Sequence, residues 1–366
     1  MESYELLKQM VEAGASDLHL QAPGHPILRI DGCLVRQTDL PSFTPEDVEQ
    51  VFESITTPEQ RSTFLNEQEL DFAYSVAQIA RFRVNVLRQR GTLSLSFRFV
   101  PFDPPSIGEL GLPRVLEEFI LKPRGLILVT GPTGSGKSTT LAAMIDHLNS
   151  HEARTIITIE DPIEHVHRDK KCLIAQRELG GDTKSFATAL KYALRHDPDV
   201  IVVGEMRDED TMSTAITAAE TGHLVLGTLH TIDAPQTVDR LISMFPSSQQ
   251  NQVRLELSQV MEAVFSQILL PRLDGKGRVA ACEIMIATPP IRNLIREART
   301  FELHNTMQLS RRGGMQILNQ ALVDLVKSNV ISRDEAVMRS SRPTQLKKIL
   351  EAPSRYATDD SGPKLL

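Results

Sequence analysis

The residues with the clearest chemistry lie near the middle of the chain, where residues 131–138 read Gly-Pro-Thr-Gly-Ser-Gly-Lys-Ser. Glycines let the backbone curve closely around an anion, because no Cβ obstructs it, and successive N–H groups can then face the anion. An apolar run at 125–130 precedes the segment and a helical pattern follows it, which is the context that such a loop requires. We therefore predict that residues 131–138 form a P-loop that binds nucleotide phosphates.

Two side chains of this loop have separate predicted roles. Lys137 is expected to reach the β- and γ-phosphates, and Ser138 is expected to hold Mg²⁺, so the predicted cofactors are ATP and Mg²⁺. The other predicted nucleotide contacts in the loop are Gly131, Pro132, Thr133, Gly134, Ser135, Gly136 and Thr139. The alternative is a glycine-rich turn that matches by accident, and the flanking strand and helix patterns argue against it.

Two acidic segments follow later apolar runs: Ile-Glu-Asp-Pro-Ile-Glu-His at 159–165 and Gly-Glu-Met-Arg-Asp at 204–208. Ligands of open α/β sheets bind at the carboxyl ends of the strands, where both segments are predicted to lie. Glu205 is the expected acidic partner of a P-loop and would hold the metal directly or through water. The segment with Glu164 fits either a site that positions water or Mg²⁺, or a solvated turn, and its position alone does not decide.

Histidines give a weaker signal. His223 and His230 bracket an apolar segment, and a zinc site that combines them with His165 and His167 is conceivable. We disfavour zinc because no cysteine joins the histidines and the P-loop already accounts for the site. A γ-phosphate sensor or a hydrogen-bonded core histidine is the preferred interpretation. The three cysteines, Cys33, Cys172 and Cys282, lie far apart and are expected to be reduced thiols.

Length and composition limit the class of protein. A chain of 366 residues is too long for one ordinary core, so two domains are expected. The net charge of -7 argues against a nucleic-acid partner, because binding to a phosphate backbone requires a basic surface. The sequence has no apolar run long enough to span a bilayer, and its N-terminus lacks a secretory-signal pattern. We therefore expect a cytoplasmic protein without direct membrane insertion.

The hydrophobic pattern changes once along the chain. Within residues 1–100, strand-like alternation at 69–100 predicts an antiparallel sheet in a small α+β domain. A proline-rich linker is predicted at 101–112. Apolar runs then alternate with helical patterns over 113–351, which predicts an α/β fold with a mainly parallel sheet that is covered on both faces, followed by helices. The polar tail at 352–366 is expected to be disordered.

Taken together and in this order, the motifs resemble those of the secretion-ATPase superfamily, which drives type II and type IV secretion and type IV pili. IEDPIEHV at 159–166 resembles the Asp box of that superfamily, DVIVVGEMRD at 199–208 its Walker B motif, and AAETGHLVLGTLHT at 218–231 its His box. The segments at 15–20, 80–91 and 288–297, which read ASDLHL, ARFRVNVLRQRG and TPPIRNLIRE, are similar to those of PilT-type pilus retraction ATPases.

This resemblance implies a RecA-like ATPase core, a PAS-like N-terminal domain and a homohexameric ring with ATP between subunits. Glu164 matches the general base, Glu205 the Walker B acid, and His223 and His230 the His box. Arg81, Arg83 and Arg98 match arginines of the N-terminal domain, some of which reach nucleotide phosphates, and an arginine suits charge on a transferring phosphoryl group. The implied function is pilus retraction in twitching motility, with an inner-membrane pilus assembly platform protein as the partner.

The chain departs from the retraction pattern at Pro290, where alanine is usual, and at Asn319, where an acidic residue is common. Proline is tolerated in a first helical turn, so the helix there is expected to form. Either change also fits an accessory retraction paralogue. The remaining alternatives are a type II secretion or pilus extension ATPase, a RecA-like nucleic-acid translocase and a nucleotide-gated scaffold. The first is disfavoured because the chain is short and lacks a Cys-x-x-Cys pair.

Overall fold

The computed structural model describes residues 3–30, 32–76, 79–101 and 104–351, and the predicted disordered tail at 352–366 lies outside these ranges. Contacts between residues divide the chain into two compact units. The first unit contains Met1–Pro104, Glu160–Asp169 and Gln176–Lys184, and the second contains Pro105–Ile159, Lys170–Ala175 and Ser185–Leu366.

The first unit contains a six-stranded sheet in the order β3-β2-β1-β6-β5-β4, in which every neighbouring pair is antiparallel. Its strands are β1 (Asp17–Gln21), β2 (Ile27–Ile30), β3 (Cys33–Arg36), β4 (Glu69–Val76), β5 (Ala80–Gln89) and β6 (Thr92–Val100). The predicted alternation in β5 is confirmed, because Phe82, Val84 and Val86 are all buried in the core. The intervening arginines lie on the other face of the strand.

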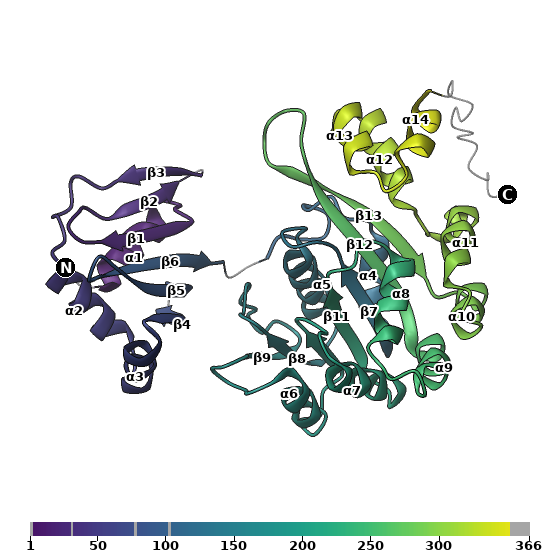
Figure 1. Ribbon diagram of the computed structural model, residues 1–366, viewed down its shortest axis with the longest axis horizontal. Helices are drawn as coiled ribbons and strands as arrows, with labels where there is room; N and C mark the ends of the chain where they lie inside the picture. The colour runs from purple at the N-terminus through teal and green to yellow at the C-terminus, as the bar shows by residue number, and fades with distance from the viewer. Residues whose placement is uncertain (1–2, 31, 77–78, 102–103, 352–366) are drawn as a thin grey trace. The chain divides into compact units, whose positions relative to one another are not determined.

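Three helices accompany this sheet (Figure 1): α1 (Ser3–Glu12), α2 (Pro45–Ile55) and α3 (Pro58–Glu67). Thr44 and Thr57 each precede a proline and a glutamate, a pattern that predicts the start of a helix. Both starts are confirmed, since each threonine caps its helix through a capping box and the proline occupies the first helical position. Proline costs nothing there, because the N–H that it lacks has no partner within a helix.

The second sheet has seven strands in the order β13-β12-β7-β11-β10-β8-β9, and most of its residues belong to the second unit. Its strands are β7 (Gly125–Thr130), β8 (Thr155–Glu160), β9 (Leu173–Glu178), β10 (Val200–Val203), β11 (Leu224–Leu229), β12 (Met261–Pro271) and β13 (Arg278–Ile286). The run from β12 to β8 is parallel, and β13 pairs antiparallel with β12. The predicted parallel sheet is therefore confirmed, with an antiparallel hairpin added at one side.

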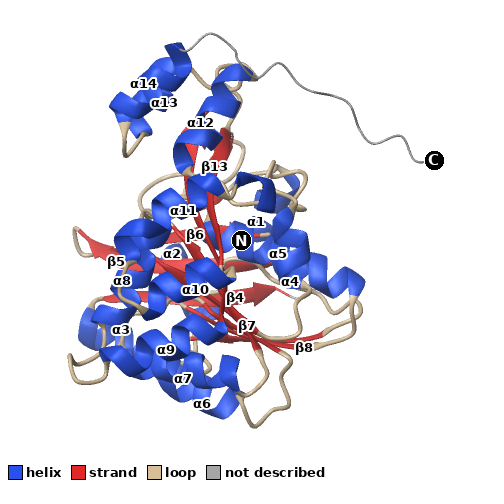
Figure 2. Ribbon diagram, turned by 90° about the vertical axis from the view of Figure 1, so that its right-hand side faces the viewer, coloured by secondary structure: helices blue, strands red, loops and turns tan. Residues whose placement is uncertain are grey.

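Strands β7, β10 and β11 are buried along their whole length, so this part of the sheet is covered on both faces, as a parallel sheet requires. Figure 2 shows helices on either side of β7. The helices of this unit are α4 (Val115–Ile120), α5 (Lys137–His151), α6 (Phe186–Ala193), α7 (Glu209–Glu220), α8 (Ala234–Ser243), α9 (Gln250–Val260), α10 (Pro289–Arg296), α11 (Leu303–Leu309), α12 (Leu318–Lys327), α13 (Arg333–Arg339) and α14 (Pro343–Glu351). Side chains of α4 and α5 pack on one face, together with Ile127 and Val129 of β7. Helices α6, α7 and α8 contact β10, β11 and β12.

The parallel strands give the second sheet two different edges. At the P-loop edge, where β7, β10 and β11 end, the Gly131 amide donates to the Leu229 carbonyl at 3.3 Å. At the opposite edge, where these strands begin, the Gly125 amide donates to the His223 carbonyl at 3.0 Å. Along β11 the two edges are about 17 Å apart, because each residue of a strand advances the chain by about 3.3 Å.

The two departures from the retraction pattern have clear structural settings. Pro289 and Pro290 occupy the start of α10, so the expected helix does form. Asn319 is buried, donates from Nδ2 to the Arg342 carbonyl at 3.2 Å and accepts from the Ser340 hydroxyl at 2.6 Å. An ionised carboxylate in place of Asn319 would have no donor for the Arg342 carbonyl.

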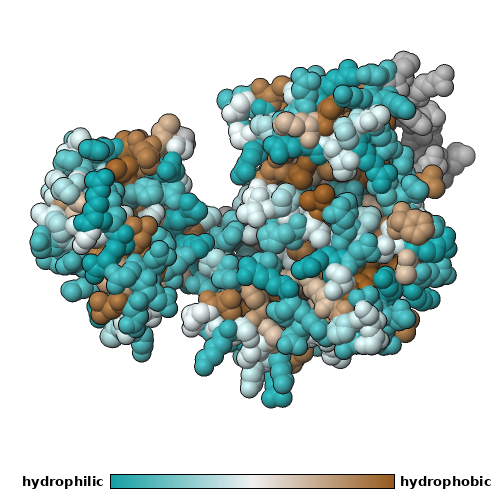
Figure 3. All heavy atoms as spheres, viewed as in Figure 1, coloured by the Kyte–Doolittle hydropathy of each residue, from teal (hydrophilic) through white to brown (hydrophobic). Residues whose placement is uncertain are grey.

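On the face shown in Figure 3, hydrophobic side chains form separate small groups among hydrophilic ones. Scattered apolar residues of this kind are normal on folded proteins. Of the helices in the described ranges, none combines the length and hydropathy needed to cross a bilayer.

Candidate functional site

The P-loop joins the end of β7 to the start of α5. Gly131, Gly134 and Gly136 have φ angles of 144°, 76° and 86°, a backbone region that residues with a Cβ rarely adopt. A Cβ at position 131 would also lie 2.2 Å from the Gln267 carbonyl oxygen and 2.6 Å from Ser135 Oγ. Both the conformation and the close approach of β12 therefore require glycine at this position.

Lys137 is the first residue of α5, and its side chain folds back over the loop. Its ammonium donates to the carbonyl oxygens of Gly131 at 2.9 Å and Pro132 at 3.2 Å, and the residue is only 9% exposed. Among the described residues, no side chain caps the start of α5, whose N-cap residue is Gly136. The amide groups of the first turn and a buried cation thus gather at one point, which favours an anion.

The remaining predicted contacts of the loop share this location. Pro132, Thr133 and Gly134 are exposed, Ser135 is buried, and Ser138 and Thr139 are half-buried in the first turn of α5. Ser135 Oγ is buried without a hydrogen-bond partner among the described residues. The structure therefore brings the whole predicted loop together around the N-terminus of α5.

Glu205 follows β10 at the P-loop edge and contacts two basic side chains. Its carboxylate lies 2.7 Å from an Arg207 nitrogen and 3.3 Å from His230 Nε2. The hydrogen bond from Arg207 is the main cause that lowers the pKa of Glu205 below its usual range, and the charges of Arg207 and His230 act in the same direction although burial opposes them. Glu205 is therefore ionised at neutral pH, with one carboxylate oxygen beside Arg207 and the other beside His230.

Glu205, Arg207 and His230 line one cavity of about 390 Å³ together with Arg240 of α8. His230 immediately follows β11, so the fold brings the predicted Walker B acid and this predicted His-box residue together. The prediction gave Arg207 no role, although the pair Glu205 and Arg207 is visible in the sequence as Glu-Met-Arg.

His223 lies elsewhere. It precedes β11 at the opposite edge, and its Nδ1 lies 2.9 Å from the Ala218 carbonyl at the end of α7. The prediction that His223 binds the nucleotide is therefore not carried forward, because β11 separates it from the P-loop within one chain. Within the described residues there is no group of three or more His, Cys, Asp or Glu side chains that could hold a metal ion.

The predicted base and arginines belong to the first unit. Glu164 is exposed in the segment after β8. The pKa of Arg83 is raised, first by its hydrogen bonds to Asp71 and also by the charges of Glu164 and Asp161, so Arg83 faces the Asp-box segment. Arg98 Nε donates to Asp17 at 2.9 Å.

Arg81 has a further role in this segment. Its guanidinium donates to Glu178 Oε2 at 2.9 Å, and the same oxygen accepts from the amide of Ile163 at 3.2 Å. Arg81 therefore braces the backbone next to Glu164 through the carboxylate of Glu178.

Sequence reasoning missed one residue of the P-loop surroundings. Gln267 of β12 is buried, and its side-chain amide bonds to both Ser135 and Thr140. The available signal was the polar pair Ser-Gln at 266–267 inside the apolar run VFSQILL, since polar residues in a buried strand need partners.

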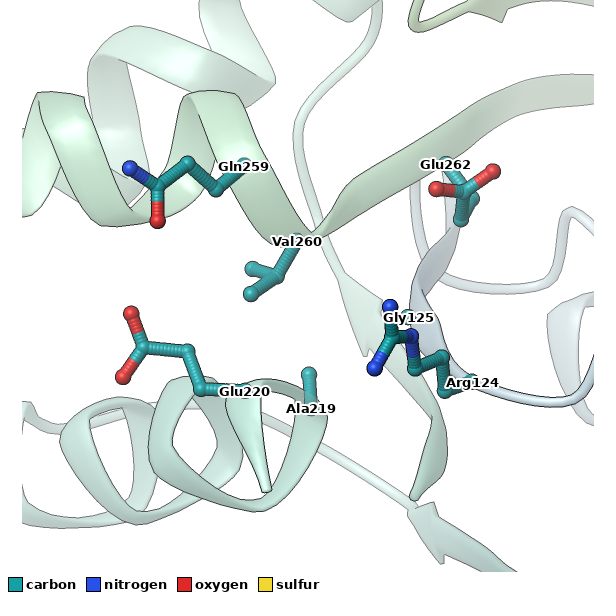
Figure 4. Close-up of a pocket in the computed structure, with 7 residues that line it drawn as sticks. All are labelled: Arg124, Gly125, Ala219, Glu220, Gln259, Val260 and Glu262. Atoms are coloured by element: carbon teal, nitrogen blue, oxygen red, sulfur yellow. The ribbon is translucent and has the colours of Figure 1, made fainter. Parts of the chain in front are cut away.

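The opposite edge contains a second, smaller cavity of about 280 Å³ (Figure 4). Arg124, Glu220, Gln259 and Glu262 line it around the backbone of Gly125, where a Cβ would approach Glu262 Cγ to 2.4 Å. Glu262 accepts from Lys122 at 2.6 Å and from Arg292 at 2.7 Å. This cavity has no glycine-rich loop or free helix N-terminus, so it does not share the chemistry of the P-loop.

The chain is similar to several pilus proteins. It is 48% identical over 343 residues to "Type IV pilus retractation ATPase PilT" of Pseudomonas aeruginosa, and the alignment covers 94% of this chain and 99% of that protein. It is 39% identical to "Type IV pilus ATPase PilU" of the same species, with 98% and 94% covered.

A solved structure described as "Crystal Structure of the Pilus Retraction Motor PilT and Bound ADP" superposes with a TM-score of 0.89 at 46% identity, covering 95% of this chain and 99% of that one. The family described as "Type II/IV secretion system protein" matches residues 4–358. The predicted RecA-like core with a smaller N-terminal domain is therefore confirmed, and the chain belongs to the type II/IV secretion system protein family of ATPases.

Proposed function

We propose that the protein is a ring-forming, Mg²⁺-dependent ATPase motor that drives type IV pilus retraction. The observation that carries the proposal is the P-loop edge itself, where Lys137 and the uncapped start of α5 share one edge with Glu205 and His230. The similarity over nearly the whole chain to a pilus retraction ATPase supports the proposal that this nucleotide chemistry drives pilus retraction.

The residues present suit a magnesium ion. Glu205 offers a carboxylate at the P-loop edge, and Ser138 offers a half-buried hydroxyl in the first turn of α5. We propose that these two residues hold Mg²⁺, directly or through water. When bound, the ion neutralises charge on the β- and γ-phosphates. Lys137 binds the same phosphates from the loop.

We propose that Glu164 activates the attacking water and that an N-terminal arginine stabilises the transferring phosphoryl group. Arg98 and Arg83 suit the second role better than Arg81, because their side chains are 70% and 44% exposed against 23% for Arg81. Arg81 instead braces the segment that carries Glu164. We retain all three as candidates until they are tested singly.

The rival functions receive less support. The PilU relative is less similar than the PilT relative, which favours a primary over an accessory retraction role. A "Type II secretion system protein E" of Xanthomonas campestris is 34% identical, and the alignment covers only 47% of that protein. A net charge of -7 speaks against a nucleic-acid substrate. The proposed partner is therefore a pilus assembly platform protein at the inner membrane, with the motor on its cytoplasmic side.

Assembly and catalysis can be tested together on the full chain. We expect electron microscopy to show six-membered rings and the specific ATPase activity to rise with protein concentration, because a trans arginine supplies roughly 10³-fold or more in other P-loop enzymes. Mixing Lys137→Ala subunits with subunits that lack all three arginines is expected to restore some activity. A monomer with concentration-independent activity would overturn the ring.

Two acid variants separate binding from hydrolysis. Glu164→Gln is expected to bind ATP normally but to hydrolyse it roughly 10²-fold more slowly, as expected after loss of a general base. Glu205→Gln is expected to lose the Mg²⁺ dependence of nucleotide affinity as well. Identical nucleotide affinities and rates in the two variants would defeat the assignment. Restored pilus retraction in a bacterium that lacks its own retraction ATPase is the test in the cell.

A further inference from the structure

Gln267 contacts the P-loop from the neighbouring strand through both ends of its side chain. Its Nε2 donates to the carbonyl oxygen of Ser135 at 2.6 Å, and its Oε1 accepts from the hydroxyl of Thr140 at 2.9 Å. Gln267 is 2% exposed, and Ser135 and Thr140 are also buried. One amide therefore links the fifth residue of the loop to the first turns of α5.

The same part of β12 contacts the start of the loop. The Gln267 carbonyl oxygen lies where a Cβ on Gly131 would meet it at 2.2 Å, and the hydroxyls of Ser266 and Thr130 lie 2.7 Å apart. Strand β12 is paired with β7 in register, with Phe265 opposite Val129 and Ser266 opposite Thr130. Consecutive residues of one strand thus contact the loop at its entry, near its middle and at its exit.

The contact to Ser135 has a consequence for the direction of the loop amides. The C=O and N–H groups of a trans peptide point in opposite directions. When Gln267 holds the Ser135 carbonyl against β12, the N–H of Gly136 must point away from β12. Without that bond the peptide between Ser135 and Gly136 is free to rotate. Its carbonyl oxygen would repel a phosphate if the oxygen turned toward the phosphate.

We propose that Gln267 is a positioning residue of the nucleotide site, which keeps the P-loop in the conformation that receives phosphate. It acts through Ser135 and Thr140 and does not itself touch the nucleotide. This inference rests on the proposed nucleotide site at Lys137. Ligand-binding groups need such buried support, because even a small relaxation of the loop turns its N–H donors away from the phosphates.

Gln267→Leu tests the proposal by removing both bonds while keeping a side chain of similar size. We expect the dissociation constant for ATP to rise roughly tenfold, because a buried carbonyl loses its donor. Gln316→Leu is the matched control. Gln316 Nε2 donates to the Cys282 carbonyl at 2.9 Å on the same hairpin but has no bond to the loop. The control is expected to bind ATP within about twofold of wild type.

Gln267→Glu gives a readout that a purely structural role would not produce. Burial raises the pKa of a carboxyl group, and only the protonated acid can donate to the Ser135 carbonyl. ATP affinity relative to wild type is therefore expected to improve several-fold as the pH falls from about 8 to about 6. The ionised form is expected to bind ATP more weakly than Gln267→Leu, because it adds a negative charge near the phosphates.

Two further variants separate the possible failures. Thr140→Val removes one hydroxyl with little change of shape and is expected to weaken ATP binding about threefold, so it decides the question if the Gln267 variants do not fold. Lys137→Ala is measured in parallel. If Lys137→Ala binds ATP like wild type, the proposed nucleotide site is wrong. If Lys137→Ala loses binding while Gln267→Leu and Thr140→Val stay within about twofold of wild type, only the role of Gln267 is overturned.

Discussion

The two edges of the second sheet meet opposite ends of the surrounding helices. At the P-loop edge, α5 and α8 begin just after β7 and β11 end, so backbone N–H groups that have no partner within their own helices gather there. At the opposite edge, α7 and α9 end just before β11 and β12 begin, so backbone carbonyls gather instead. One sheet therefore offers an anion-binding edge and an edge that favours cations.

Two carboxylates, one buried and one half-buried, show the same difference. Glu283 of β13 is 3% exposed and accepts from the amides of Ala234 and Leu318, the first residues of α8 and α12. Glu262 at the opposite edge accepts from the side chains of Lys122 and Arg292. Backbone donors satisfy the first acid, whereas charged side chains are needed for the second.

Arg292 also illustrates the electrostatics of the opposite edge. Its guanidinium donates to the carbonyls of Ser258 at 2.9 Å and Gln259 at 2.6 Å, in the last turn of α9. A cation at a helix C-terminus is favourable, because the macrodipole is negative there. Arg292 belongs to the segment at 288–297 that is similar to PilT-type retraction ATPases, and it ties α10 to α9 and to β12 at the edge away from the P-loop.

The largest predicted effect distinguishes the two edges of the second sheet by comparing the loss of one cation at each edge. Lys137→Ala is expected to reduce ATP hydrolysis by at least ~10²-fold, because no other side chain of the loop places a cation at the phosphates. Arg124→Ala, at the opposite edge, is expected to leave the rate within about twofold of wild type. Steady-state ATPase assays measure both. Comparable losses in the two variants would show that the P-loop edge is not the catalytic one.

The second prediction concerns Glu283. Burial raises its pKa from the ordinary 4.5 to about 7, with the charge of Asp233 acting in the same direction and the two helix amides opposing. The folded state therefore holds a proton that the unfolded chain has lost between those pH values, and stability falls as the pH rises through this window. The full penalty is about 3 kcal/mol above the window.

Glu283→Gln removes this titration and keeps an acceptor for one helix amide. We expect wild type to be the more stable protein at about pH 5 and to lose that advantage by about pH 8. Urea unfolding of both proteins across the range measures the change. Parallel stability curves for the two proteins would show that the helix N-termini hold Glu283 ionised throughout.

The third prediction compares the histidines at the two ends of β11. His230→Ala is expected to slow hydrolysis roughly tenfold, because the Glu205 carboxylate loses its contact with His230 Nε2. His223→Ala is expected to leave ATP affinity within about twofold of wild type, since the His223 side chain bonds near the end of α7, away from the P-loop. If His223→Ala weakened ATP binding, a neighbouring subunit would have to bring that edge to the nucleotide.

Much of the fold could be predicted because its signals are local. The strands at 125–130 and 200–203 form where the apolar runs lie. The glycines of the P-loop indicate a backbone conformation that residues with a Cβ rarely adopt. The apolar pattern of residues 4–13 predicts a helix that buries Tyr4, Leu7 and Val11. In α1, Leu7 is buried but Tyr4 is exposed, and Met10 is buried instead, because apolar residues lie on two faces of this helix.

Long-range contacts were harder to predict. His223 is far from the P-loop because the start of β11 lies at the opposite edge of the sheet. The motif that contains His223 and His230 does not show which end of β11 lies at which edge. The role of Gln267 depends on the pairing of β12 with β7, which joins residues more than a hundred positions apart. The bond between Glu178 and Arg81 likewise joins segments that no local pattern connects.

The smallest predicted effect tests whether the two edges are independent. Glu262→Gln keeps the shape but removes the charge that pairs with Lys122 and Arg292. Since the Glu262 side chain is 18% exposed, we expect a loss of about 1 kcal/mol in unfolding free energy, which urea denaturation measures. Glu351→Gln, in an exposed pair with Arg333, is the control and is expected to show no measurable loss. The KM for ATP is expected to stay unchanged in both variants. A raised KM in Glu262→Gln would mean that β12 transmits the disturbance from its start to Gln267 and the P-loop, and the edges would then act as one site.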